Sequence, residues 1–131
     1  MDDLLLDIIE YLVEEGVLEG DGVDAFRDFA PDSPDDVTII YEYQGDPQAL
    51  HEDTAVHRSL QIVSRSKQPT TAKVKANEIH AFLSPPGRYK KLNENRWCQL
   101  YPRQTPFKIK TDDNGRVYYG YNFGVTSYKD Y

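Results

Sequence analysis

The chain has 131 residues, which is enough to bury one hydrophobic core without a disulfide or a structural metal. Aromatic residues make up 12% of it, which argues against a disordered chain, and the net charge of −7 at pH 7 opposes tight binding to a polyphosphate. The lone cysteine, Cys98, excludes an intramolecular disulfide and fits a reducing compartment. The N-terminus has neither a basic segment nor a long apolar run, so we expect no signal peptide and no membrane span.

Acidic and basic residues are separated along the chain. Residues 1–54 contain 17 carboxylates against a single base, Arg27, which gives this segment a net charge of −16. Residues 55–131 contain 14 lysines and arginines against five carboxylates, a net charge of +9. Such an asymmetry is typical of a charged tail, a nucleic-acid surface, or a molecule whose two sides meet different partners. Folding can also intermix the two signs, and the sequence leaves both outcomes open.

The first helix is expected over residues 2–15. An apolar stripe at helical spacing runs along it through Leu5, Ile8, Ile9 and Leu12. Asp2 or Asp3 can cap its start, and Gly16 can supply the left-handed residue that ends it.

Two strands and an acidic turn are expected next. Alternation over residues 23–29 indicates a short strand that Pro31 ends. Residues 31–36 read as a rigid acidic turn, and residues 37–43 are the clearest strand of this half, because valine, isoleucine and tyrosine alternate onto one face. The polar segment 44–55 is long for a loop of a compact domain, which makes it a functional candidate.

A strand and a second helix are expected in the middle of the chain. Residues 56–65 alternate between apolar and polar side chains. Pro69 fits the first turn of the helix, and the Pro85-Pro86 pair stops it. Its buried stripe is expected to be Ala72, Ala76, Ile79 and Leu83, with Lys73 and Lys75 facing water.

The last third is predicted to be β, with strands over residues 96–103, 107–110 and 116–126. Asn114-Gly115 indicates a type I′ hairpin turn, because both residue types tolerate positive φ. The predicted fold class is therefore α+β: a single domain, residues 1–131, with a mixed or antiparallel β-sheet and two main helices packed against it. The predicted order is α-β-β-β-α-β-β-β.

We find no motif for catalysis, for a cofactor or for a metal. The chain has no phosphate loop and no nucleophile elbow, and its acidic turn resembles a calcium loop only in charge. The histidines lack the spacing of a metal site and are expected at the surface or in loops: His51, His57 and His80. Chance pairs of carboxylates are certain among 22 of them, and nothing singles out one pair for hydrolysis. We therefore expect no enzyme activity.

Basic and aromatic residues interleave between Arg88 and Tyr119, which is the composition of a platform that stacks single-stranded nucleic acid. Several of the rings, however, stand at alternating strand positions, where core packing or subunit contact is commoner than base stacking: Trp97, Phe107, Tyr119 and Tyr121. A single-strand nucleic-acid-binding module is thus the second hypothesis. An acidic DNA mimic that inhibits a nuclease or repressor is the third.

Three stretches of the chain resemble one family of viral proteins. The first is the acidic proline turn of residues 29–36, followed by the strand and Gly/Pro loop of residues 39–47. The second is the strand of residues 58–65 with the helix after it, and the third comprises residues 104–107, 112–116 and 121–125 of the closing hairpin. Their order and spacing resemble the minor capsid or tail-terminator proteins of long-tailed bacteriophages. The central strand departs from the arginine-rich strand frequent in that family.

The resemblance implies an α+β subunit that assembles as a homo-oligomeric ring, typically of six, and closes the growing end of the tail tube. The implied partners are further copies of the chain, the major tail tube protein and a head-completion or stopper protein. DNA would pass through the lumen without specific binding. The implied location is the head–tail junction of the virion, after synthesis in the host cytoplasm.

The charge separation suggests residue-level roles in such a ring. Acids of the 44–55 loop would face the lumen, where they repel phosphate, or a neighbouring subunit: Asp46, Glu52 and Asp53. A complementary basic surface would face the adjoining subunit or another ring: Arg88, Lys90, Lys91 and Arg103.

Overall fold

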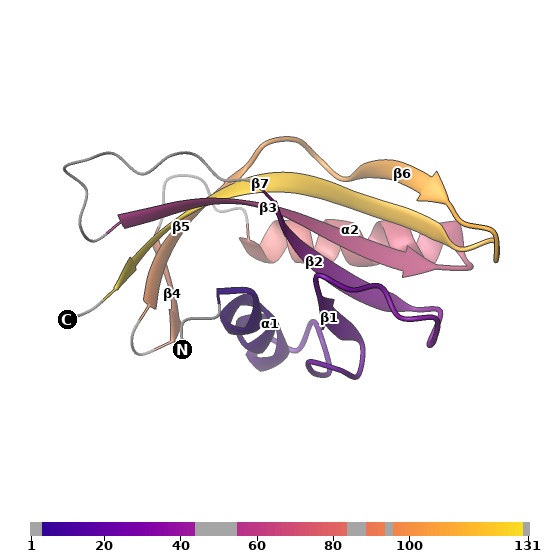
Figure 1. The fold of residues 1–131 in the computed structure, drawn as a ribbon, viewed down its shortest axis with the longest axis horizontal. Coiled ribbons are helices and arrows are strands. Elements are labelled where there is room, and N and C mark those ends of the chain that lie inside the picture. Colours follow the sequence, from indigo (N-terminus) through magenta and orange to yellow (C-terminus); the bar gives the residue numbers. More distant parts are fainter. Residues whose placement is uncertain (1–3, 44–54, 84–88, 94–95, 130–131) are drawn as a thin grey trace.

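The computed structural model describes residues 4–43, 55–83, 89–93 and 96–129 (Figure 1). Within these ranges the chain forms two helices and one seven-stranded mixed sheet. The elements in chain order are α1 (Leu4–Glu14), β1 (Ala25–Arg27), β2 (Val37–Tyr43), β3 (Ala55–Ser66), α2 (Pro69–Leu83), β4 (Tyr89–Asn93), β5 (Arg96–Pro102), β6 (Phe107–Thr111) and β7 (Val117–Lys129). The predicted α+β class and single sheet are confirmed.

The sheet is organised around β7. Its strand order is β1-β2-β3-β7-β5-β4, and β6 pairs with β7 outside this path. Only β1 and β2 are parallel, whereas the other pairs are antiparallel. β3 follows one edge of β7 over all 12 of its residues, while β5 and β6 share the other edge, one after the other. Between β5 and β6, the backbone N–H of Asn122 has no strand partner among the described residues. It donates instead to Oε1 of Gln104 (2.9 Å).

The predicted order lacks one strand, β4, because Tyr-Lys-Lys-Leu-Asn shows no clear alternation and follows a proline stop. β4 forms through pairing with β5, so tertiary context overrides weak local preference. The proposed caps of α1, Asp2 and Asp3, lie outside the described residues. So does the long polar loop from residue 44 to residue 54.

α1 ends as its sequence predicts. Gly16 adopts a φ of 78°. Its N–H donates to the carbonyl O of Val13 (3.0 Å), and the N–H of Val17 donates to the carbonyl O of Leu12 (2.9 Å). This pair of bonds is the Schellman arrangement, which satisfies carbonyls that the last helical turn leaves open. Lys75 of α2 adds a donor, because its Nζ reaches the carbonyl O of Val17 (2.8 Å); its side chain is still 37% exposed, so the prediction that Lys75 faces water is confirmed in part.

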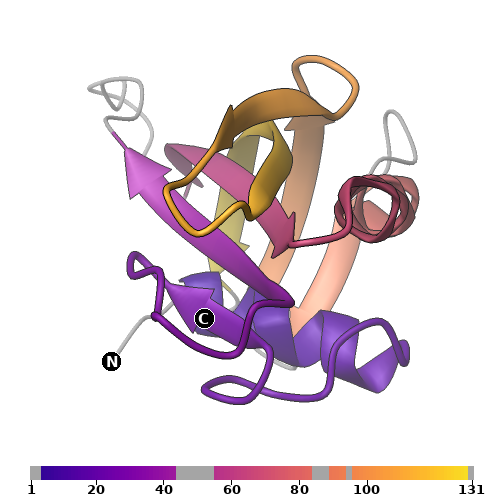
Figure 2. The same ribbon diagram turned by 90° about the vertical axis from the view of Figure 1, so that its right-hand side faces the viewer.

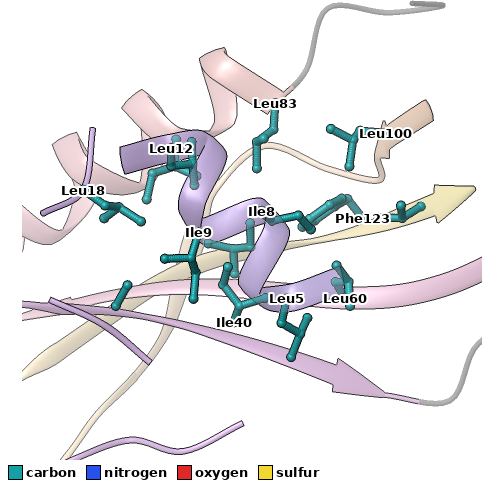
Figure 3. Close-up of a cluster of buried hydrophobic side chains, with 14 of the residues drawn as sticks. Leu5, Ile8, Ile9, Leu12, Leu18, Ile40, Leu60, Leu83, Leu100 and Phe123 are labelled. Atoms are coloured by element: carbon teal, nitrogen blue, oxygen red, sulfur yellow. The ribbon is translucent and has the colours of Figure 1, made fainter. Parts of the chain in front are cut away.

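Both helices pack on one side of a strongly curved sheet (Figure 2). α2 contacts β3, β5 and β7, whereas α1 contacts β1 and β2 at one end of the sheet and β4 at the other. Figure 3 shows the resulting core, in which the α1 stripe packs in one cluster with aliphatic and aromatic side chains of β1, β2, β3, β5, β7 and α2. The predicted stripes of both helices are buried: Leu5, Ile8, Ile9, Leu12, Ala72, Ala76, Ile79 and Leu83. Full burial of each larger aliphatic side chain contributes about 1.5–3 kcal/mol.

The β6–β7 hairpin forms where predicted, with a different turn. Gly115 has a φ of 77°, whereas Asn114 does not have a positive φ. The N–H of Gly115 donates to the carbonyl O of Asp112, and the N–H of Asp112 donates to the carbonyl O of Arg116, both at 3.0 Å. This is a type I turn followed by a left-handed glycine, so the type I′ prediction is wrong. The carboxylate of Asp112 accepts the N–H of Asn114 (3.0 Å) and favours this alternative.

Gly120 of β7 lies against the backbone of β3, which leaves no room for a side chain at this position. A Cβ at this position would overlap the carbonyl O of Ile62 and lie 3.0 Å from the Cα of Val63. Both obstacles belong to the backbone of β3, which cannot move without disturbing the longest ladder of the sheet.

We expect Gly120→Ala to lower the free energy of unfolding by about 1–3 kcal/mol, the usual cost of overpacking a closed site. Urea unfolding followed by circular dichroism measures it. Gly20→Ala is the matched control, since its Cβ would meet only Cγ2 of Val23 at an ordinary 3.7 Å. Equal midpoints for both variants would show that the strands can separate at no cost.

Candidate functional site

The hollows of the described structure do not assemble a reactive site. A cavity of about 130 Å³ opens beside α2, between it and β2 and β3. Its hydroxyls Thr38 Oγ1 and Ser64 Oγ bond each other (3.2 Å), and the carboxylate of Asp24 accepts the N–H groups of Glu19 and Gly20 (3.0–3.1 Å). These polar groups hold loops and strands together. Among the described residues no three His, Cys, Asp or Glu side chains gather as a metal site, and no helix there has the length and apolarity to cross a bilayer.

The residues proposed from the sequence as ring surfaces are only partly described. Asp46, Glu52, Asp53 and Arg88 lie outside the described residues. Lys90 and Lys91 belong to β4, and their side chains are likewise outside the described part.

Arg103 is the one member of that set whose side chain is described. It is exposed beside β5, with Nη2 donating to Oγ of Ser59 at 3.3 Å. Its backbone N–H continues the ladder to the carbonyl O of Asn122 (3.0 Å). With Arg103 the one described side chain of the two sets, the roles of the proposed basic surface and the proposed acidic loop stay predictions.

A buried arginine of β3 holds the acidic turn of residues 31–36. Arg65 is only 2% exposed, although alternation places it on the polar face of its strand. Its Nε donates to the carbonyl O of Asp35 (3.1 Å) and its Nη2 to the carbonyl O of Pro34 (2.7 Å). The two bonds use the fork of the guanidinium group on two successive main-chain acceptors.

A second buried arginine completes the hold from the hairpin. The Nη1 of Arg116 donates to the carbonyl O of Asp32 and lies 3.7 Å from Oδ1 of Asp35. Its Nε donates to Oδ2 of Asp112 (2.8 Å), and the hydroxyl of Tyr118 donates to the same oxygen (3.1 Å). We call Arg65, Arg116 and Asp112 the arginine clamp. It joins the acidic turn to β3 and to the β6–β7 hairpin.

Hydrogen bonds set the protonation of the clamp carboxylate. Burial alone would raise the pKa of Asp112 from its ordinary 3.8. The backbone and side-chain donors of Arg116, the hydroxyl of Tyr118 and the N–H of Asn114 outweigh burial and lower this pKa to about 2. Asp112 is therefore ionised over the whole physiological pH range.

Ion pairs reduce the separation of the two charge halves. Among the described residues, pairs that link the acidic half to the basic half include Arg58–Glu42 (3.8 Å), Lys67–Asp35 (3.7 Å) and Arg116–Asp35 (3.7 Å). Folding therefore intermixes the two signs around the acidic turn. Acids on α1, such as Glu10 and Glu14, stay exposed.

Two flanks of the sheet expose large apolar side chains beside charges. We define the β1 flank as Asp21, Phe26, Asp28 and Phe29, and the β6 flank as Phe107, Lys108 and Lys110. Phe29 is 59% exposed, its ring centroid stands 6.3 Å from that of Phe26, and both line a surface groove of about 430 Å³. Phe107 is 41% exposed. Of the rings expected in the core or in subunit contact, Tyr121 is fully buried, whereas Phe107 is not.

Sequence reasoning missed the clamp. Composition places Arg116 in a basic surface, yet only 5% of it is exposed. One signal was available, namely that a proline-rich turn has carbonyl groups without ladder partners and needs donors from elsewhere. Nothing in the sequence says which of 15 bases supplies them.

A family model described as bacteriophage tail terminator protein matches residues 11–129. The match extends from the second half of α1 to the last residue of β7, and so includes the whole sheet and the clamp. Curated protein sequences contain no significant match to the chain.

We expect Arg116→Met to lower the free energy of unfolding by about 3 kcal/mol, because it leaves a carboxylate and a carbonyl without their buried donor. Urea unfolding at pH 7 measures it. Arg103→Met, at an exposed arginine, is the control and should cost less than about 1 kcal/mol. Equal losses would mean that the clamp adds nothing beyond an ordinary surface arginine.

The lowered pKa of Asp112 predicts a pH dependence. A carboxyl group with a folded-state pKa of about 2 contributes stability above its unfolded pKa, and this contribution disappears as the pH falls through about 4 to about 2. Asp112→Asn should therefore be less stable than the wild type at pH 7, and the difference should shrink toward pH 2. Unfolding midpoints measured from pH 7 to pH 2 test this, with exposed Asp113→Asn as control. A difference that does not vary with pH contradicts the assignment.

Proposed function

The chain belongs to the bacteriophage tail terminator family, and on that premise we propose that it forms a ring, with six subunits as the expected number, that closes the end of the tail tube. The ring then receives a head-completion or stopper protein, and DNA passes through its lumen. The protein is a structural virion component of the phage tail. The family match over residues 11–129 is the observation that carries the proposal.

The shape of the subunit supports assembly by head-to-tail contacts. A ring of identical subunits needs two different surfaces on each copy, so that one meets the other around the circle. The β1 and β6 flanks supply two such surfaces with different residues. Both expose an aromatic ring, and aromatic residues are enriched at interfaces.

Electrostatics support passage of DNA without binding. The net charge of −7 repels phosphate, and exposed acids on α1 and in the acidic turn, such as Glu10, Glu14, Asp32 and Asp36, add to this repulsion. We propose Asp46, Glu52 and Asp53 for the lumen, where carboxylates keep DNA from adhering. Lys90, Lys91, Arg88 and Arg103 are proposed for contact with a neighbouring subunit or ring.

Tail tubes assembled in vitro test the function directly. Tubes grown from the major tail tube protein should stop elongating when the protein is added, and negative-stain images should show one ring at the capped end. Tubes that continue to elongate with bare ends would refute the proposal. Retardation of single-stranded DNA at about 50 mM salt would favour the nucleic-acid-binding alternative instead.

Salt dependence of the ring tests its electrostatic part. Raising the ionic strength from 0.1 M to 1 M shortens the screening length from about 10 Å to about 3 Å. We expect the apparent dissociation constant of neighbouring subunits to rise about tenfold, measured by native mass spectrometry after buffer exchange or by sedimentation. An unchanged constant would leave apolar contacts as the whole basis of association.

A further inference from the structure

Exposed large apolar side chains are few in the described structure, and two of the four, both aromatic, lie on the two flanks. They are Val23 (54%), Phe29 (59%), Phe107 (41%) and Val74 (57%). Val23 and Phe29 bracket β1, and Phe107 begins β6, whereas Val74 stands by itself on α2. Side chains of this size gain about 1.5–3 kcal/mol from full burial, so two exposed rings next to strand edges mark interaction surfaces.

The two flanks lie on opposite sides of the subunit. β1 ends the strand order, and β6 pairs with β7 alone, so each has one edge without a strand partner among the described residues. In both Figure 1 and Figure 2, β6 lies at the top of the molecule and β1 at the bottom. Surfaces on opposite sides can meet those of neighbouring copies without competing within one subunit.

The charges of the flanks are complementary. On the β1 flank, the carboxylate of Asp21 accepts two hydrogen bonds of 3.1 Å from Arg27, so the charges of these two side chains cancel. The exposed carboxylate of Asp28 then gives the groove a net negative charge. The β6 strand carries Lys108 and Lys110, both exposed, and no carboxylate. Nζ of Lys110 lies 4.7 Å from the Tyr118 ring centroid, which holds this cation on the flank. Opposite potentials of this kind orient partners during association.

We propose that the β1 flank of one subunit binds the β6 flank of the next copy, with Phe107 entering the groove beside Phe26 and Phe29. The inference rests on the ring put forward above and specifies its subunit contact. The groove, at about 430 Å³, lies within the size range of pockets that accept a ligand group. Phe107 acts as the apolar anchor at the centre, and Lys110, whose register partner Tyr118 lies on the same face of β7 as the partner of Phe107, faces Asp28.

Two single variants and their mixture test the contact. Phe29→Asp disables only the β1 flank, and Phe107→Asp disables only the β6 flank. Val74→Asp is the matched control, because it places the same charge at an equally exposed apolar position outside both flanks. All three positions are exposed, so the variants should fold, and urea midpoints verify this.

Native mass spectrometry, with one variant isotope-labelled, gives the readout. We expect rings from the wild type and from Val74→Asp, and monomers from each flank variant alone. The equimolar mixture of Phe29→Asp and Phe107→Asp should give a heterodimer and nothing larger, since one intact β1 flank meets one intact β6 flank. Rings from either flank variant, or no heterodimer in the mixture, would overturn the contact.

Tail tubes separate failure of this contact from failure of the proposed function. If the wild type forms rings only on tubes, the occupancy of tube ends replaces the mass readout. Val74→Asp should then cap, and both flank variants should leave ends bare. Capping by a flank variant overturns the contact while the function stands. A wild type that neither forms rings nor caps tubes overturns the function itself.

Discussion

The fold depends on where the apolar stripe of α1 is buried. This helix has 11 residues, of which five are buried, and it contacts strands from both ends of the sheet. A flat sheet could not bring β1 and β4 to the same short helix, so burial of the stripe requires the sheet to curve. The strand order, with β2, β3 and β7 between β1 and β6, separates the β1 flank from the β6 flank. The core thus depends on one hydrophobic contact, and the arrangement of the outer surfaces on the sheet that this contact curves.

The arginine clamp has a different physical basis and a local effect. Guanidinium groups buried at 2% and 5% exposure are costly unless every donor is used, and here they meet backbone carbonyls and carboxylates of the turn and hairpin. The clamp draws part of the negative half of the chain onto the positive half. A neighbouring subunit or passing DNA therefore meets the surface charges that no ion pair neutralises. The total charge of each half does not describe this surface.

Spacing and backbone preference along the sequence predict the helices and strands that have strong periodicity. They fail where pairing with a distant segment determines the structure. The stripes of Ile8 and Ile79, the end of α1 at Gly16 and the long strand β7 follow from spacing and backbone preference. β4 does not follow from local preference, because it forms by pairing with the edge of β5 and needs β5 to be in place first. The turn at Asn114 differs from the type I′ turn that Asn-Gly predicts, because the side chain of Asp112 supplies a competing acceptor. Alternation places Arg65 on the polar face of its strand, but it does not say what covers that face.

The bonds of the clamp to the acidic turn run mainly to main-chain oxygens, those of Asp32, Pro34 and Asp35. A carbonyl group is the same whichever residue carries it. The identities of the turn's outward side chains are therefore largely uncoupled from the force that fixes its path. Such a segment can exchange charges over evolutionary time, and so adapt to a changing partner, without a matching change in the arginines that hold it.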